Sequence, residues 1–169
     1  MKRIRLCFYE PRGEQENWLN RVVAGLSRNY VCHVEILFAD EMAASIYADG
    51  EVFFRPRTYS NPYYRIKGFT VSASSYRLMY AFAQAAAERQ TRFSNAKMFC
   101  GPLLGFRGSS DETFCSEFVT QALQVGGVPF AMKMDAGRST PSSLLDRMTA
   151  IETVCFDSTP FKLEQALRL

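Results

Sequence analysis

The first half of the chain alternates between apolar and polar positions, a pattern that predicts β-structure. The opening RIRL shows this alternation, and the later VCHVEILF adds a run of β-branched and aromatic residues. The dipeptide Asp49-Gly50 is favoured in tight turns, so the segments on either side of it predict an antiparallel hairpin. Five strands are expected in this half, over residues 3–9, 31–38, 42–47, 52–57 and 63–71.

Helical spacing of apolar residues dominates several other segments. Residues 18–26 predict a first helix, and residues 74–90 carry one continuous apolar stripe with Ser74 or Ser75 as the expected cap. A further helix is expected from Cys115 to the glycine pair 126–127. The last part of the chain predicts three more elements: a short helix begun by Thr140-Pro141, a strand over 151–156 and a helix over 161–167.

Size and composition indicate one packed domain. The chain has 169 residues, of which 47% are hydrophobic and 22% charged, so residues 1–169 are expected to form a single domain. Strands followed by helices favour the α+β class, with an antiparallel sheet packed beside helices. No apolar run is long enough to span a bilayer, and the opening MKRIRLCFYEPRGEQ turns polar too early for a secretory signal. A cytoplasmic protein without a membrane span is therefore expected.

Charge and cysteine content narrow the classes of partner and cofactor. The net charge is +3 and the basic residues are scattered, which argues against nucleic acid as a partner. The five cysteines form no CxxC pair and no Cys/His cluster at zinc-ligand spacing. Free thiols in a reducing compartment, with no metal and no cofactor, are the expectation. Histidine occurs once, at His33, so any imidazole base must be this residue.

Cys115, at the start of its predicted helix, is a candidate nucleophile. A thiol attacks carbonyl groups as the thiolate, and the ordinary pKa of about 8.5 leaves only a small fraction ionised at neutral pH. With Thr113 as the expected cap, Cys115 lies in the first turn, where unpaired backbone N–H groups and the helix dipole favour an anion. The backbone N–H of Cys115 is also the expected oxyanion donor.

His33 is the candidate base, and it shares one face of its predicted strand with Glu35 because side chains two residues apart point the same way. Each of these signals also has a purely structural interpretation. A cysteine among aromatic residues is often a small core residue, and a histidine on a strand often bonds a backbone group or water. Glu35 is either a residue that orients the imidazole or a solvated charge at the edge of the sheet.

The order of the segments resembles the circularly permuted NlpC-type papain-like proteins of bacteria and large DNA viruses. A strand with HV.I, a hairpin, a linking strand and helix, a loop, and then FCSEFV.QAL cover roughly residues 31–128. In ordinary papain-like enzymes the cysteine helix precedes the histidine strand, whereas the permuted branch has the opposite order. The residues that match the family motifs are His33, Val34, Ile36, Phe114, Cys115, Ser116, Glu117, Phe118 and Val119.

By this resemblance, Cys115 is the nucleophile and His33 the base of a papain-like fold whose antiparallel sheet packs against helices that include the cysteine helix. The resemblance implies thiol hydrolase or acyltransferase chemistry on amides, esters or thioesters, without a metal. Two departures stand out. The family usually has glycine at the position of Glu35, and its third polar residue is expected near Ala44 or Ser45, where this chain has no carboxylate or amide. Glu35 and Ser45 are therefore both candidates to orient the imidazole.

The glycine-rich loop over residues 92–111 is expected to form one wall of the cleft. Its apolar side chains suit a peptide, a protein or an acyl-lipid substrate, although they can also simply fix the loop to the core. The candidate substrate-binding residues are Phe93, Phe99, Leu103, Leu104 and Phe106. Two functions remain open: a thiol peptidase-like hydrolase or acyltransferase, and a catalytically weakened papain-like module that binds a peptide or lipid.

Overall fold

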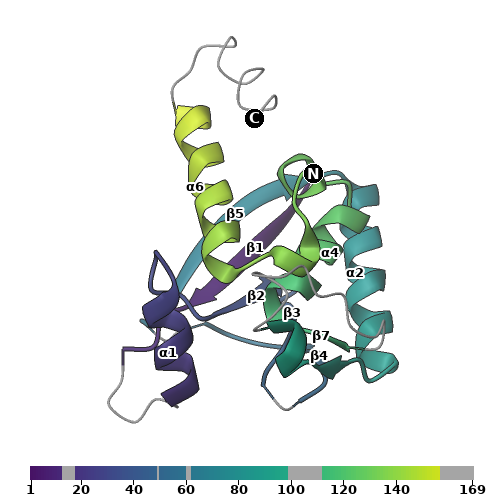
Figure 1. Cartoon of the computed structure of the whole chain (residues 1–169). Helices are drawn as coiled ribbons and strands as arrows, with labels where there is room; N and C mark the ends of the chain where they lie inside the picture. The colour runs from purple at the N-terminus through teal and green to yellow at the C-terminus, as the bar shows by residue number, and fades with distance from the viewer. Residues whose placement is uncertain (13–17, 49, 60–61, 99–111, 157–169) are drawn as a thin grey trace.

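A five-stranded antiparallel sheet forms the centre of the protein, for which we describe a computed structural model (Figure 1). The structure describes residues 1–12, 18–48, 50–59, 62–98 and 112–156. The strands lie in the order β4-β3-β2-β1-β5, which confirms both the five predicted strands and the hairpin. Their bounds are β1 Lys2–Tyr9, β2 His33–Leu37, β3 Met42–Ile46, β4 Val52–Pro56 and β5 Tyr64–Val71.

The predicted helices over 18–26 and 74–90, and the one that starts at Cys115, are confirmed, whereas α5 and η1 were not predicted and the last segment differs. They are α1 Trp18–Leu26, α2 Ala73–Glu88, α4 Cys115–Val125, α5 Pro129–Met132, the 3₁₀ turn η1 Ala136–Arg138, and α6 Pro141–Phe156. Helix α6 is longer than expected, and the strand predicted over 151–156 is wrong. A strand needs a neighbouring strand for its backbone hydrogen bonds, whereas continuing α6 satisfies the same groups locally. The helix predicted over 161–167 lies outside the described residues.

Helix boundaries show how short side chains select the first turn. The Ser72 hydroxyl accepts a hydrogen bond from the Ser75 backbone N–H at 3.0 Å, so Ser72 caps α2 and the predicted cap at Ser74 or Ser75 is wrong. The cap of α6 is as predicted, since the Thr140 hydroxyl accepts from the Ser143 N–H at 3.1 Å. At the end of α4, Gly127 has a φ of +66°, a conformation that favours glycine.

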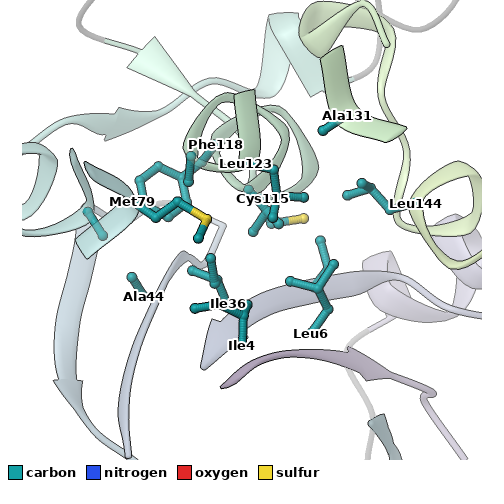
Figure 2. Packing of buried hydrophobic residues seen from close by; sticks show 14 of the residues in the cluster. Ile4, Leu6, Ile36, Ala44, Met79, Cys115, Phe118, Leu123, Ala131 and Leu144 are labelled. Atoms are coloured by element: carbon teal, nitrogen blue, oxygen red, sulfur yellow. The ribbon is translucent and has the colours of Figure 1, made fainter. Parts of the chain in front are cut away.

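The main core lies between the sheet and helices α2 and α4. Figure 2 shows Ile4 and Ile36 pointing from the strands toward Met79 of α2 and Phe118 of α4, all of them buried. The opposite face of the sheet carries a smaller apolar cluster around Cys7, Leu37 and Ala43. Because side chains alternate along a strand, His33 and Glu35 lie on the Leu37 side of β2, opposite Val34 and Ile36.

A short parallel ladder leads into the cysteine helix. Strand β6, Arg92–Phe93, pairs with β7, Glu112–Thr113, and β7 ends two residues before Cys115. The start of α4 is thereby fixed relative to the segment that carries Phe93. In the described ranges, no helix combines the length and the apolar character that crossing a bilayer demands.

Candidate active site

Cys115 is the first residue of α4, as the sequence predicts. The residue before it, Phe114, is the N-cap in an extended conformation and provides no side-chain cap. The predicted Thr113 cap is wrong, because the Thr113 hydroxyl bonds the Glu117 carboxylate at 3.2 Å instead. Phe114 itself therefore caps none of the first-turn N–H groups next to the Cys115 thiol, and N–H groups at a helix start favour an anion.

A buried ion pair holds this first turn in place. Lys97 Nζ lies 3.6 Å from Glu117 Oε1 and donates a 2.6 Å hydrogen bond to the backbone carbonyl of Glu112. Burial raises the pKa of Glu117, and the charge of Lys97 and the Thr113 hydroxyl oppose that rise. The pair and the Thr113 hydroxyl give Glu117 a structural role at the start of α4.

His33 is the first residue of β2 and is buried, with 8% of its surface exposed. Its Nε2 lies 3.5 Å from Glu35 Oε1, a distance typical of an ion pair rather than of a short hydrogen bond. Burial alone lowers the pKa of His33, but hydrogen bonding and charge from Cys115 and Glu35 outweigh it and raise the pKa to about 9. The structure therefore brings Cys115 into one cluster with His33 and Glu35, although Cys115 follows His33 by 82 residues in the sequence.

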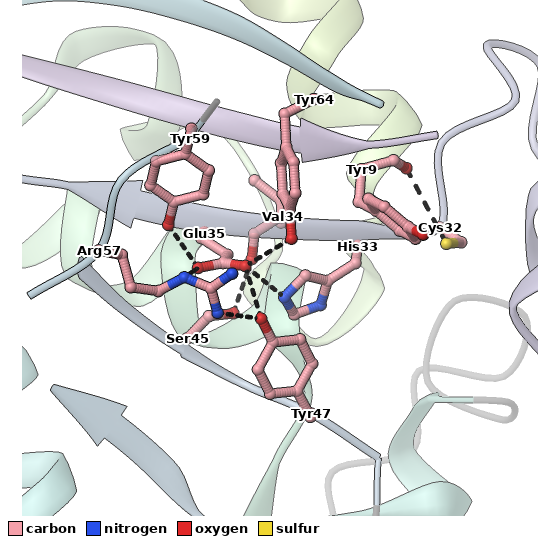
Figure 3. Close-up of polar contacts among 10 residues, drawn as sticks. All are labelled: Tyr9, Cys32, His33, Val34, Glu35, Ser45, Tyr47, Arg57, Tyr59 and Tyr64. Carbon is pink, nitrogen blue, oxygen red and sulfur yellow. Dashed lines mark hydrogen bonds and ion pairs between the residues drawn. The ribbon is translucent and has the colours of Figure 1, made fainter. Parts of the chain in front are cut away.

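Glu35 is fully buried and lies at the centre of a polar network (Figure 3). Its Oε1 accepts from the Tyr47 hydroxyl at 2.9 Å and the Tyr64 hydroxyl at 3.1 Å, and its Oε2 accepts from the Tyr59 hydroxyl at 2.5 Å. Arg57 Nε lies 3.6 Å from Oε2. Burial raises the pKa of Glu35, but the bond and charge of His33, followed by Tyr59 and Arg57, lower it to about 2. Glu35 is thus an ionised residue behind the imidazole and not a solvated edge charge.

Ser45 does not orient the imidazole. Its hydroxyl donates a 2.6 Å hydrogen bond to the backbone carbonyl of Val34, and the side chain is fully buried. The ladder between β2 and β3 pairs Leu37 with Ala43 and Ile36 with Ala44. The bond from the Ser45 hydroxyl to Val34 joins the same two strands beyond these pairs. Its short side chain is satisfied by the neighbouring backbone, so the alternative that assigned it to His33 is wrong.

A pocket of about 400 Å³ opens beside Cys115 and His33. Phe93 lines it, as predicted, together with Val23 and Met98. The other predicted wall residues, Phe99, Leu103, Leu104 and Phe106, lie outside the described residues. Much of the described wall is more polar than expected, because it includes Tyr9, Asn20, Tyr47, Arg57, Tyr59 and Tyr64.

The residues around Glu35 were not identified from the sequence as parts of a site. The rings of Tyr59 and Tyr64 pack on the cluster of Cys7, Leu37 and Ala43. Their hydroxyl groups have the second role of binding Glu35. Extending the observed pairing of Ile36 with Ala44 by three residues places Tyr47 across from His33, so the position of Tyr47 follows from the register of the sheet.

Comparison with known proteins adds no family to this description. No protein-family model, curated protein or solved structure matches the chain. The likeness to permuted NlpC-type proteins therefore depends on the motif residues and remains a prediction. What is established is the α+β architecture and the cluster of a thiol, an imidazole and a carboxylate beside a pocket.

The remaining described cysteines differ from Cys115 in their surroundings. Cys7, Cys32 and Cys115 are all buried, and none of the three forms a disulfide. Burial, followed by the charge of Glu35, raises the pKa of Cys7 to about 12, so this thiol stays protonated. Cys32 lines the same pocket as Cys115 and is the thiol to distinguish from it in a labelling experiment. Within the described ranges, no three His, Cys, Asp or Glu side chains are grouped in a way that would hold a metal ion.

Proposed function

We propose that the protein is a cysteine-dependent hydrolase or acyltransferase of papain-like, circularly permuted NlpC type, acting on an amide, ester or thioester. The observation that carries the proposal is that the only histidine in the chain contacts both a thiol at a helix start and a buried ionised carboxylate. A chance arrangement of core residues would not need a fully buried carboxylate with four partners behind the ring. The pocket of about 400 Å³ at the thiol supports the same interpretation.

The first chemical step forms a thioester on Cys115. The thiolate attacks the carbonyl carbon, a carbon–sulfur bond forms, and the carbonyl π electrons move to the oxygen. The backbone N–H of Cys115, in the first turn of α4, donates to that oxyanion. The His33 imidazolium then gives its proton to the departing nitrogen, oxygen or sulfur as the bond to the carbonyl carbon breaks.

The second step returns the enzyme to its starting state. The neutral imidazole of His33 takes a proton from water or from an acceptor nucleophile, which attacks the thioester carbon. The carbon–sulfur bond breaks, the thiolate of Cys115 leaves, and the imidazolium is restored. Glu35 keeps its charge throughout and holds the ring in orientation, as the buried acid of a catalytic triad does.

Thiol labelling followed by peptide mapping tests this function directly. An iodoacetamide or vinyl sulfone probe is expected to modify Cys115 faster than Cys7 or Cys32 at neutral pH. Replacing His33 with alanine is expected to slow the labelling of Cys115 and the turnover of an activated acyl ester by about a hundredfold or more. Equal labelling of all the cysteines, together with no effect of His33→Ala, would contradict the proposal.

The alternative is a papain-like module that binds a peptide or lipid without turning it over. The low exposure of Cys115, 7%, is the observation that favours it. Ligand binding that survives Cys115→Ser, with no turnover of amide, ester or thioester substrates by the unmodified protein, would support this alternative. Loss of acyl-ester turnover in Cys115→Ser would exclude it.

A further inference from the structure

Tyr47 contacts both residues behind the Cys115 thiol. Its ring stacks on the imidazole of His33, with a centroid distance of 4.7 Å and an interplanar angle of 21°. Its hydroxyl donates to Glu35 Oε1 at 2.9 Å. One side chain therefore restrains the plane of the imidazole and also one oxygen of the carboxylate next to it (Figure 3).

Tyr47 is itself held on two sides. Phe53 of β4 stacks on its ring at 5.3 Å and 18°, so three nearly parallel rings run across neighbouring strands in the order His33, Tyr47, Phe53. Arg57 donates through Nη1 to the Tyr47 hydroxyl, and its guanidinium carbon lies 5.8 Å from the centre of the Tyr47 ring. The hydroxyl thus accepts from Arg57 while it donates to Glu35, which leaves its rotation little freedom.

We propose that Tyr47 is a positioning residue of the active site, which fixes the orientation of the His33 imidazole toward Cys115 by ring stacking and by its bond to Glu35. This inference rests on the proposed function. It also gives a physical reason for the missing polar residue near Ala44 or Ser45: the strand next to β2 still restrains the imidazole, but through an aromatic ring at position 47 and not through a carboxylate or amide.

The contact between His33 and Glu35 explains why such a restraint matters. At 3.5 Å, Nε2 is buried and makes no hydrogen bond of good geometry, so the carboxylate alone does not fix the plane of the ring. A stacked neighbour restricts the rotation that an ion pair leaves free. Tyr47 is also 38% exposed and lines the pocket, so it can carry out this function without being sealed away from the substrate side.

Two substitutions separate the two contacts. Tyr47→Phe keeps the stacked ring and removes the hydroxyl, whereas Tyr47→Leu removes both. Tyr80→Phe is the matched control, because Tyr80 donates a 3.0 Å bond to Asp40 and does not line the pocket beside Cys115. The control loses one tyrosine–carboxylate bond of similar length without touching His33.

The imidazole provides a readout that does not depend on turnover. Since the chain has one histidine, NMR titration of its ring follows His33 without ambiguity. The groups that face His33 are Glu35 on its own strand, Tyr47 on the neighbouring strand segment, and Cys115 on α4, with Arg57 behind them. We expect the pKa of His33 to fall toward 6.5 in Tyr47→Leu, because the ring is no longer held against Glu35 and Cys115, and to change less in Tyr47→Phe.

Labelling and turnover give the second readout. Tyr47→Leu is expected to reduce the labelling rate of Cys115 and kcat by about tenfold, with a smaller change in KM, because a displaced base weakens the chemical step. If Tyr47→Leu matches Tyr80→Phe in both the His33 titration and the labelling rate, the inference is wrong. Should Tyr47→Leu fail to fold by circular dichroism, Phe53→Leu removes the ring behind Tyr47 and must show the same direction of change.

Failure of this inference is distinguishable from failure of the proposed function. If Tyr47 has no effect while His33→Ala still abolishes turnover, Tyr47 is structural and the Cys115–His33 chemistry stands. If His33→Ala and Cys115→Ser leave turnover unchanged, the proposed function fails. The titration of His33 in the Tyr47 variants then still shows whether Tyr47 positions the ring.

Discussion

His33 Nε2 and Glu35 Oε1 lie 3.5 Å apart, and both residues belong to strand β2. The pair is local, because residues two apart on a strand share a face. The base and its carboxylate partner therefore require only that β2 forms. The long-range requirement is the approach of α4, which brings Cys115 to the same ring.

Removing the charge of Glu35 is expected to weaken both the site and the fold. Glu35→Gln should lower the pKa of His33 and slow Cys115 labelling by about tenfold or more, because the imidazolium loses its buried partner. Arg57 also loses its counter-ion, so the free energy of unfolding should fall by about 1–3 kcal/mol. Urea denaturation and NMR titration measure the two effects. An unchanged His33 titration would show that the carboxylate does not act on the ring.

The titration of the His33 imidazole is expected to depend on Cys115. Cys115→Ala should lower the pKa of His33, because a hydrogen bond with Cys115 and its charge help to raise that pKa to about 9. NMR titration of the single imidazole checks this without any substrate. Cys7→Ala is the control for the loss of a buried thiol, since Cys7 lies across from Glu35 in the ladder between β1 and β2 and does not contribute to the pKa shift of His33. Equal titration curves for the two variants would contradict a Cys115–His33 contact.

Stability should decrease on the alkaline side of neutrality. The folded protein holds the proton of His33 to about pH 9, whereas the ordinary pKa is 6.5, so the stabilisation is complete below pH 6.5 and is lost as the pH rises through 9. The expected loss in the free energy of unfolding is on the order of 1–3 kcal/mol. Denaturation in urea at pH 6, 7, 8 and 9 measures it. In His33→Gln, the free energy of unfolding should no longer show this decrease between pH 6 and pH 9.

Acid should destabilise the protein through Glu35. Its folded pKa of about 2 lies below the ordinary 4.5, so its stabilisation is present above pH 4.5 and is lost as the pH falls toward 2. Glu117 has a raised pKa and works in the opposite direction. The free energy of unfolding, measured between pH 2 and pH 5 for the unmodified protein and for Glu35→Gln, isolates the contribution of Glu35. Parallel curves for the two proteins would show that Glu35 makes no such contribution.

The buried Lys97–Glu117 pair is expected to support the start of the cysteine helix. Lys97→Met leaves Glu117 buried without its cation and should reduce the free energy of unfolding by about 3 kcal/mol. The double variant Lys97→Met with Glu117→Leu should recover part of that loss, because no unpaired charge remains. Chemical denaturation of the single and double variants closes the cycle. Simple addition of the two single effects would rule out coupling.

The periodicity of the sequence was sufficient for most of the fold. Alternation in β1 and the apolar stripe of α2 are local signals, and they predicted the elements because the same side chains form the core. The errors arose where competing partners decided the outcome. The Thr113 hydroxyl bonds the Glu117 carboxylate and not a backbone N–H of α4, and Ser72 is the N-cap of α2 in place of Ser74 or Ser75. Residues 151–156 extend α6. The strand prediction failed there because the composition of a segment does not show whether a neighbouring strand is available to pair with it.

The site was predictable only in part for a related reason. Cys115 and His33 carry chemistry that few residue types provide, so their types and order pointed to a pair. The choice between Glu35 and Ser45 depended on where each side chain's hydrogen bonds go, and this is a property of the assembled sheet. The role of Tyr47 depends on the stacking of three strands side by side, which becomes visible only with the register known.

The network around Glu35 has a consequence for how this sequence can change over evolutionary time. A buried negative charge with three hydroxyl donors and one guanidinium tolerates neither its own loss nor the loss of many donors at once. Chains that descend from the same ancestor should therefore keep or replace Glu35, Tyr47, Arg57, Tyr59 and Tyr64 as a set. A descendant with glycine at position 35 should have an apolar residue where Tyr59 now stands.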